Sequence, residues 1–240
     1  MASRVEIVDW LNDYLEIHAF RDWVKGNVIA GKEEIKKVAL AVDGDVVLNC
    51  NADMLISHHA PFWIYQMKPF GKEEQTPHDI IRKKGINLYV AHLPLDAHPE
   101  VGNSVELIKR IGFEPGNDER ERYSPVKRVD TDIEFEELLK RTEVISKNPS
   151  VHKFGPDRIK EFYVCTGYGG GEISRINSRG FAYITGEFTH SSYYRARAYK
   201  ANVIALGHYD TETLGVKALG KKLEAKFNVK TEFIDAPTGL

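Results

Sequence analysis

The same arrangement of residues occurs twice in this chain, and it restricts the fold more than any other feature of the sequence. An apolar run is followed by a histidine, by a carboxylate four positions later, and then by an amphipathic helical pattern. The first copy contains His92 and Asp96, and the second contains His208 and Glu212. Short apolar runs bounded in this way are typical of buried strands. The repeat therefore predicts an internal duplication in which strands alternate with helices.

Further strand and helix patterns support a mainly parallel α/β fold. A charged, turn-rich stretch at 116–126 predicts a boundary between two similar halves, residues 1–125 and 126–240, with the last helix and strand packing back on the first half. Thr131 and Glu134 have capping-box spacing and predict the start of a helix. Apolar runs predict additional strands at 37–42, 54–56, 161–166, 181–185 and 229–234.

Composition narrows the class of protein. The 33 basic and 35 acidic residues give a net charge of −2, which argues against a protein that binds nucleic acid by bulk charge. Two cysteines, Cys50 and Cys165, are too few for a disulfide framework or a thiolate zinc site and favour a reducing, cytoplasmic compartment. The first residues lack the pattern of a signal peptide, and no apolar run approaches membrane-spanning length, so we expect no membrane partner.

A third histidine element, His58-His59, follows another short apolar run. Adjacent histidines at a strand end are either two surface residues or a pair of metal ligands, because strand ends hold ligands rigidly. With the two repeated elements, the candidate ligands number six, too many for one tetrahedral ion. The set suits two divalent ions with a bridging carboxylate. Nitrogen and oxygen ligands leave zinc, iron, manganese, nickel and cobalt open. The six are His58, His59, His92, Asp96, His208 and Glu212.

Three other segments each allow a functional and a structural interpretation. Glu187 and His190 follow a predicted strand, and they either support the metals and transfer protons or, for Glu187, cap a helix. The GYGGG sequence at 167–171 either cradles a phosphate or, the favoured reading, forms a tight turn. The aromatic-rich segment 61–70 either stacks a base or covers the metals or, again favoured, serves in packing or at a subunit interface.

The motifs SHHAPFW, AHLPLDAHPEVGNS, ITGEFTH and GHYDTE together resemble those of the GTP cyclohydrolase I type-two homologue family, the Nif-three-like proteins. The resemblance runs nearly end to end. It implies two similar, intertwined three-layer α/β/α halves, a toroidal homohexamer and a dinuclear metal centre. It also implies that His92 is a neighbour of the metals and that Glu187 and His190 lie beside them. The metal ligands implied by the motifs are His58, His59, Asp96, His208 and Glu212.

The resemblance leaves three hypotheses for function. The first is a metal-dependent hydrolase that acts on a nucleotide or another phosphate-bearing substrate, with Glu187, His190 and His92 as catalytic residues. The second is a metal-binding oligomeric scaffold or regulatory protein without enzymatic activity. The third is a ring that nucleic acid threads, which the near-balanced charge disfavours. Turnover of GTP or a small phosphoester would distinguish the first hypothesis from the second.

Overall fold

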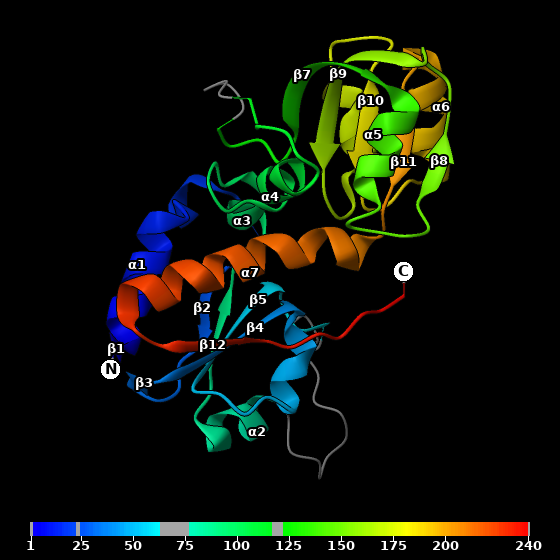
Figure 1. Cartoon of the computed structure of the whole chain (residues 1–240). Helices are drawn as coiled ribbons and strands as arrows, with labels where there is room; N and C mark the ends of the chain where they lie inside the picture. Colours follow the sequence, from blue (N-terminus) through cyan, green and yellow to red (C-terminus); the bar gives the residue numbers. More distant parts are fainter. Residues whose placement is uncertain (1, 23–24, 63–76, 117–121, 240) are drawn as a thin grey trace. The chain divides into compact units, whose positions relative to one another are not determined.

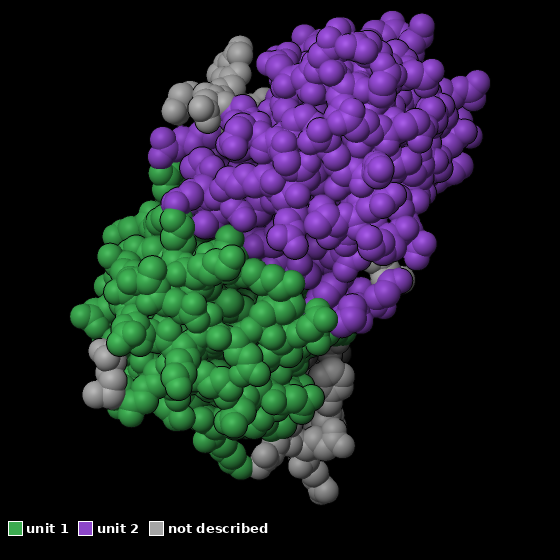
Figure 2. All heavy atoms as spheres, viewed as in Figure 1, with its two compact units in different colours: residues 1–95, 216–236 green, residues 96–215, 237–240 purple. Residues whose placement is uncertain are grey.

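The computed structural model describes residues 2–22, 25–62, 77–116 and 122–239. It contains two compact units, which Figure 2 colours separately. Unit 1 comprises residues 1–95 and 216–236, and unit 2 comprises residues 96–215 and 237–240. Each unit is built on its own five-stranded sheet.

The sheet of unit 1 is parallel except at one edge. Its strand order is β12-β4-β5-β6-β2, and β2 alone runs antiparallel to its neighbour. A separate two-stranded pair joins β1 (Ala2–Ser3) and β3 (Glu34–Ile35). The strands of the main sheet are β12 (Lys230–Phe233), β4 (Lys37–Asp43), β5 (Met54–His59), β6 (Asn87–Val90) and β2 (Gly26–Ile29).

Helices cover both faces of this sheet. On one face, α2 (Pro77–Lys84) and the 3-10 helix η2 (Gly44–Leu48) pack through Ile81 and Val47 onto strand residues such as Leu55. On the other, the hydroxyl of Tyr89 donates to Asn12 of α1 (Arg4–Tyr14), 3.0 Å away. The C-terminal part of α7 (His208–Phe227) also packs there, since Gly220 lies directly against Leu40 of β4.

The sheet of unit 2 has three parallel strands between two antiparallel edge strands. The order is β7-β9-β10-β11-β8, as Figure 1 shows. The bounds are β7 (Lys127–Glu134), β8 (Ser150–His152), β9 (Arg158–Cys165), β10 (Ala182–Thr185) and β11 (Asn202–Ala205).

Alternating side chains give unit 2 a hydrophobic core on each face of its sheet. Phe162 of β9 packs with α4 (Asn103–Arg110) and α5 (Phe135–Thr142). The next residue, Tyr163, packs on the opposite face with the 3-10 helix η5 (Gly169–Arg175) and α6 (His190–Tyr199). This period-2 alternation produces three layers, α/β/α, so the predicted α/β fold with two halves is confirmed.

The predicted helix start at Thr131 is wrong. Thr131 lies inside β7, and α5 begins at Phe135 without a side-chain cap from Glu134. Strand pairing outweighs the local capping pattern here, because β7 pairs with β9 and buries Val129 and Ile133 in the core. The edge strand β8 is not among the strands that the apolar runs predict.

The compact units differ from the expected halves 1–125 and 126–240. Residues 96–125 belong to unit 2, because Leu107 and Ile108 of α4 and the following Ile111 are buried in the core that covers β9. The last strand, β12, pairs in parallel with β4 of unit 1. Among the described residues, no helix combines the length and the apolar character that crossing a bilayer would require.

Two buried asparagines make equivalent contacts in the two units. Gly31 N donates to Asn87 Oδ1 at 2.7 Å, and Asn87 Nδ2 donates to the carbonyl of the residue after Gly31 at 3.0 Å. Gly155 N likewise donates to Asn202 Oδ1 at 2.7 Å, and Asn202 Nδ2 donates to the carbonyl of the residue after Gly155, again at 2.7 Å. Both asparagines are 0% exposed and begin the third parallel strand of the run β4-β5-β6 or β9-β10-β11. This shared detail supports the internal duplication.

We expect Asn87→Ala and Asn202→Ala each to lower the free energy of unfolding by about 2–4 kcal/mol, because each leaves buried backbone groups without a partner at about 1–3 kcal/mol apiece. Urea denaturation measures the change. The exposed Asn148 provides the control, and Asn148→Ala should stay within about 0.5 kcal/mol of the parent protein. Equal midpoints for all three variants would show that the asparagine contacts carry no stability.

Candidate metal centre

Three histidines of unit 1 converge where two parallel strands end. Strand β5 continues through His58 and His59, so both lie in the strand itself, and His92 follows β6 by two residues. Parallel pairing with β5 continues one residue past the end of β6, where Ala91 N donates to Ser57 O at 2.8 Å. One nitrogen atom from each histidine lies within 4.8 Å of those of the other two.

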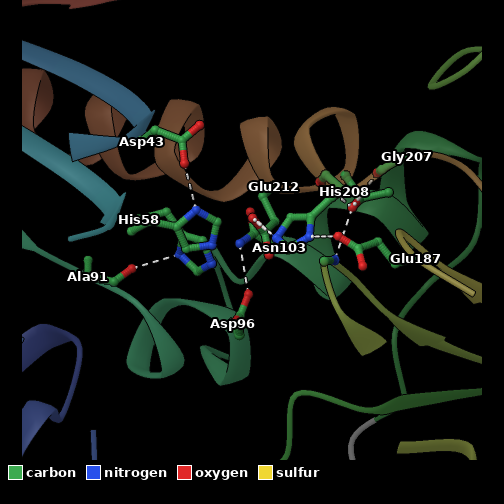
Figure 3. Close-up of polar contacts among 12 residues, drawn as sticks. Asp43, His58, Ala91, Asp96, Asn103, Glu187, Gly207, His208 and Glu212 are labelled. Atoms are coloured by element: carbon green, nitrogen blue, oxygen red, sulfur yellow. Dashed lines mark hydrogen bonds and ion pairs between the residues drawn. The ribbon is translucent and has the colours of Figure 1, made fainter. Parts of the chain in front are cut away.

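Each of these imidazoles is held through its Nδ1 atom. His58 Nδ1 lies 2.9 Å from the carbonyl oxygen of Ala91, and Figure 3 shows this contact. His59 Nδ1 lies 2.9 Å from Asp43 Oδ1. His92 Nδ1 lies 3.2 Å from both carboxylate oxygens of Asp22. A carbonyl oxygen can only accept, so Nδ1 of His58 carries the proton and its Nε2 presents a lone pair.

The two aspartates were not among the residues that the sequence suggested. Asp43 ends β4 and pairs in register with His59 on β5, so the neighbouring strand ends contained a signal that could have identified it. Asp22 lies 70 positions from His92, with its side chain only 4% exposed, and also accepts from Leu93 N at 3.1 Å. No local pattern links residues so far apart.

In unit 2, the GHYDTE element opens a helix instead of preceding one. Helix α7 begins at His208, so Glu212 lies one turn later on the same face. His208 Nε2 lies 3.1 Å from Glu212 Oε2, and Glu212 is 3% exposed. His208 Nδ1 lies 2.5 Å from Glu187 Oε1, as Figure 3 shows. Glu187 thus orients His208 in the way that aspartate and carbonyl oxygens orient the histidines of unit 1.

The same unit contains Asp96 and His190, which have different surroundings. Asp96 lies in the short helix α3 (Leu93–Ala97), is 8% exposed and accepts from Asn103 Nδ2 at 2.9 Å. His190 begins α6, is exposed and packs edge-on against Tyr194, with 5.3 Å between ring centroids. Thr189 caps α6 by accepting from Ser192 N. Thr189 therefore caps this helix, whereas the Glu187 carboxylate is hydrogen-bonded to His208.

In the glycine-rich segment, the backbone of Gly167 passes close to the carboxylate of Glu212. Gly167 has a φ of +57°, and a Cβ added there would lie 1.8 Å from Glu212 Oε1 and 3.3 Å from His208 Nε2. Only glycine fits such a position. Beyond it, η5 begins at Gly169, whose carbonyl accepts from the hydroxyl of Tyr183 at 2.6 Å. Of the aromatic segment, Trp63, Tyr65 and Phe70 lie outside the described residues, and Phe62 is exposed.

The donor chemistry of both units fits a divalent metal. Metal-binding histidines generally donate their second ring N–H to a carboxylate or carbonyl, and His58, His59, His92 and His208 all have such an oxygen beside Nδ1. With the proton on Nδ1, the lone pair that a metal ion requires lies on Nε2 of each ring. Thiolate ligation is disfavoured, because burial raises the pKa of the Cys50 and Cys165 thiols. The structure thus contains histidine and carboxylate groups that could bind a metal ion.

The fold and the site together define a class: two-unit α/β proteins with histidines and carboxylates at their strand ends. The model of the Duf34/NIF3 (NGG1p interacting factor 3) family matches residues 2–238, and the chain belongs to this family. A relative from Pyrococcus abyssi named GTP cyclohydrolase 1 type 2 homolog is 41% identical, covering 99% of this chain and 100% of the relative. A relative of the same name from Archaeoglobus fulgidus is 34% identical, covering 98% of each chain.

Solved structures match over the same length. The crystal structure of TTHA1606 from Thermus thermophilus is 35% identical, with a TM-score of 0.85, covering 99% of this chain and 100% of that chain. The protein ybgI, described as of unknown function, is 27% identical, with a TM-score of 0.86 and the same coverage. The family resemblance inferred from the motifs is therefore confirmed.

We expect Gly167→Ala to weaken metal binding by about 10- to 100-fold, because the added methyl group displaces the Glu212 carboxylate. Chelator competition with zinc measures the affinity. Gly171→Ala is the matched control, since a Cβ at Gly171 meets nothing within 4 Å. Equal zinc affinity in the two variants would remove Glu212 from the metal ligands.

Proposed function

We propose that this protein is a dinuclear metal-dependent hydrolase. The observation that carries the proposal is the common orientation of four histidines, each with an oxygen acceptor at Nδ1. Histidines that bind a metal or lie beside one have a physical reason to share this arrangement, whereas surface histidines have none. The names of the relatives, GTP cyclohydrolase 1 type 2 homolog, favour hydrolytic chemistry.

Five residues are proposed as ligands of the two ions. They are His58, His59, Asp96, His208 and Glu212, the set that the family resemblance implies. Two neighbouring divalent ions repel each other strongly, and Asp96 and Glu212 would supply the negative charge that offsets this repulsion. Zinc, iron, manganese, nickel and cobalt all suit these donors. When bound, the ions would make a water molecule nucleophilic near neutral pH.

The remaining side chains hold ligands or move protons. Asp43 and Glu187 fix the rings of His59 and His208 through Nδ1, so Nε2 of each ring would be the atom that binds a metal. Asp22 accepts a hydrogen bond from Nδ1 of His92. Nε2 of His92 could then accept or donate a proton in the reaction. The exposed His190 is proposed as a second proton carrier that meets the substrate from solvent.

The proposed substrate is a nucleotide or another phosphate-bearing molecule. The test is a screen of purified protein, loaded with each metal in turn, against GTP and a panel of small phosphoesters. Metal-dependent turnover that disappears on chelation would support the proposal. Stable metal binding without turnover, together with a partner protein in a pull-down, would favour the alternative of a non-enzymatic metal-binding scaffold. The two free cysteines suggest a reducing, cytoplasmic setting for either function.

The carboxylates should contribute more to metal retention than His92 does. Asp96→Asn and Glu212→Gln keep the side-chain shape but remove the charge that offsets two cations. We expect each to lower bound metal from about two ions per chain to one or none. We expect His92→Asn to retain most of the metal. Mass spectrometry of metal content after dialysis, on protein checked by circular dichroism, makes the comparison. Loss of metal in His92→Asn alone would show that His92 is a metal ligand and that Asp96 and Glu212 are not.

We propose that the chain assembles into a closed homo-oligomer, a hexamer by the family resemblance. The aromatic-rich segment 61–70 favours this, because so apolar a stretch is typical of an interface, and Phe62 at its start is 69% exposed. Sedimentation velocity at micromolar concentration should give a single species of about six times the 27.2 kDa chain mass. A stable monomer would contradict the proposal.

A further inference from the structure

A fully buried amide, Asn103, connects Asp96 to the helix that carries His208 and Glu212. Asn103 is the first residue of α4 and is 0% exposed. Its Nδ2 donates to Asp96 Oδ1 at 2.9 Å, a contact visible in Figure 3. Its Oδ1 accepts from Gly215 N at 2.8 Å, although Gly215 lies 112 positions later in the sequence. All of these residues belong to unit 2.

The chemistry of the two partners fixes the orientation of this amide. Gly215 N–H can only donate, so the oxygen of Asn103 must face α7. The NH₂ group must then face Asp96, whose ionised carboxylate can only accept. An amide is the side chain of this size that meets both demands without adding charge. Its NH₂ group donates to one of the two carboxylate oxygens of Asp96.

The approach of α7 to Asn103 requires a glycine. A Cβ at position 215 would lie 2.6 Å from Asn103 Oδ1 and 3.0 Å from the carbonyl oxygen of Val101. Glycine inside a helix costs about 0.5–1 kcal/mol relative to alanine, so its presence here fits a need for close contact. Gly215 lies three residues after Glu212, within one turn of the same helix.

We propose that Asn103 is a positioning residue that holds the Asp96 carboxylate at a fixed place relative to His208 and Glu212. This inference rests on the proposed function, since it assumes that Asp96 and Glu212 bind metal. Asn103 is hydrogen-bonded to Asp96 and to the backbone N–H of Gly215. It acts through Asp96 on one side and through the backbone of α7 on the other.

The test is the zinc affinity of Asn103→Asp, measured by competition with a chromophoric chelator. The aspartate keeps the acceptor for Gly215 N but turns an oxygen toward Asp96 in place of the donor. An added negative charge would by itself strengthen cation binding. We nevertheless expect zinc affinity to fall by about 10- to 100-fold, the usual effect of losing a hydrogen-bond partner of a ligand. A fall in zinc affinity would therefore come from the lost hydrogen bond to Asp96 and not from the added charge.

Asn202→Asp is the matched control. Asn202 is also 0% exposed in unit 2 and also bridges by its amide, but its partners are the backbone groups of 154–156. We expect it to lower the melting temperature of the metal-free protein while leaving zinc affinity unchanged. Unchanged affinity in Asn103→Asp, or an equal fall in both variants, would overturn the inference. Absence of zinc binding by the parent protein would overturn the proposed function instead.

A measurement on the parent protein keeps the test independent of variant folding. In ¹⁵N-labelled protein, we expect addition of zinc to shift the side-chain amide signals of Asn103, because its partner carboxylate becomes a ligand. The signals of Asn87 and Asn202 should stay in place, since their partners are backbone groups. Zinc binding that leaves the Asn103 signals unmoved would overturn the inference.

Discussion

Parallel pairing of strands is the interaction on which the candidate site depends. Parallel strands end at the same edge of a sheet, so residues that follow neighbouring strands come together there. Pairing of β5 with β6 brings His58 and His59 to His92. Pairing of β10 with β11 brings Glu187, which follows one strand, to His208, which follows the next. The helices on both faces bury these sheets and thereby keep the strand ends rigid.

The duplication supplies one scaffold twice, but the chemistry at its strand ends has diverged. Asn87 and Asn202 make equivalent contacts at the start of β6 and β11, so the two units share details of loop structure as well as topology. At the other end of the neighbouring strands, unit 1 has two histidines where unit 2 has Gly186 and Glu187. The second unit therefore contributes an anchoring carboxylate where the first contributes candidate ligands.

Sequence reasoning failed where long-range pairing or packing decided the outcome. Thr131 has the spacing of a helix cap, yet its segment becomes a strand because β9 offers it a partner and a core to cover. Asp22 shows no motif of its own, because an anchoring residue needs only one polar group at the right place. Such a requirement leaves no pattern in the local sequence.

The sequence by itself determined the α/β class, most strand and helix positions, the duplication, the family and the candidate ligands. These features follow from local periodicity and from short motifs, both of which operate within about a dozen residues. Only the tertiary structure decided which oxygen holds each imidazole, why position 167 must be glycine, and how Asn103 reaches Gly215. The physical reason is separation along the chain: contacts between residues 70 or 112 positions apart exist only once the sheets and helices have packed.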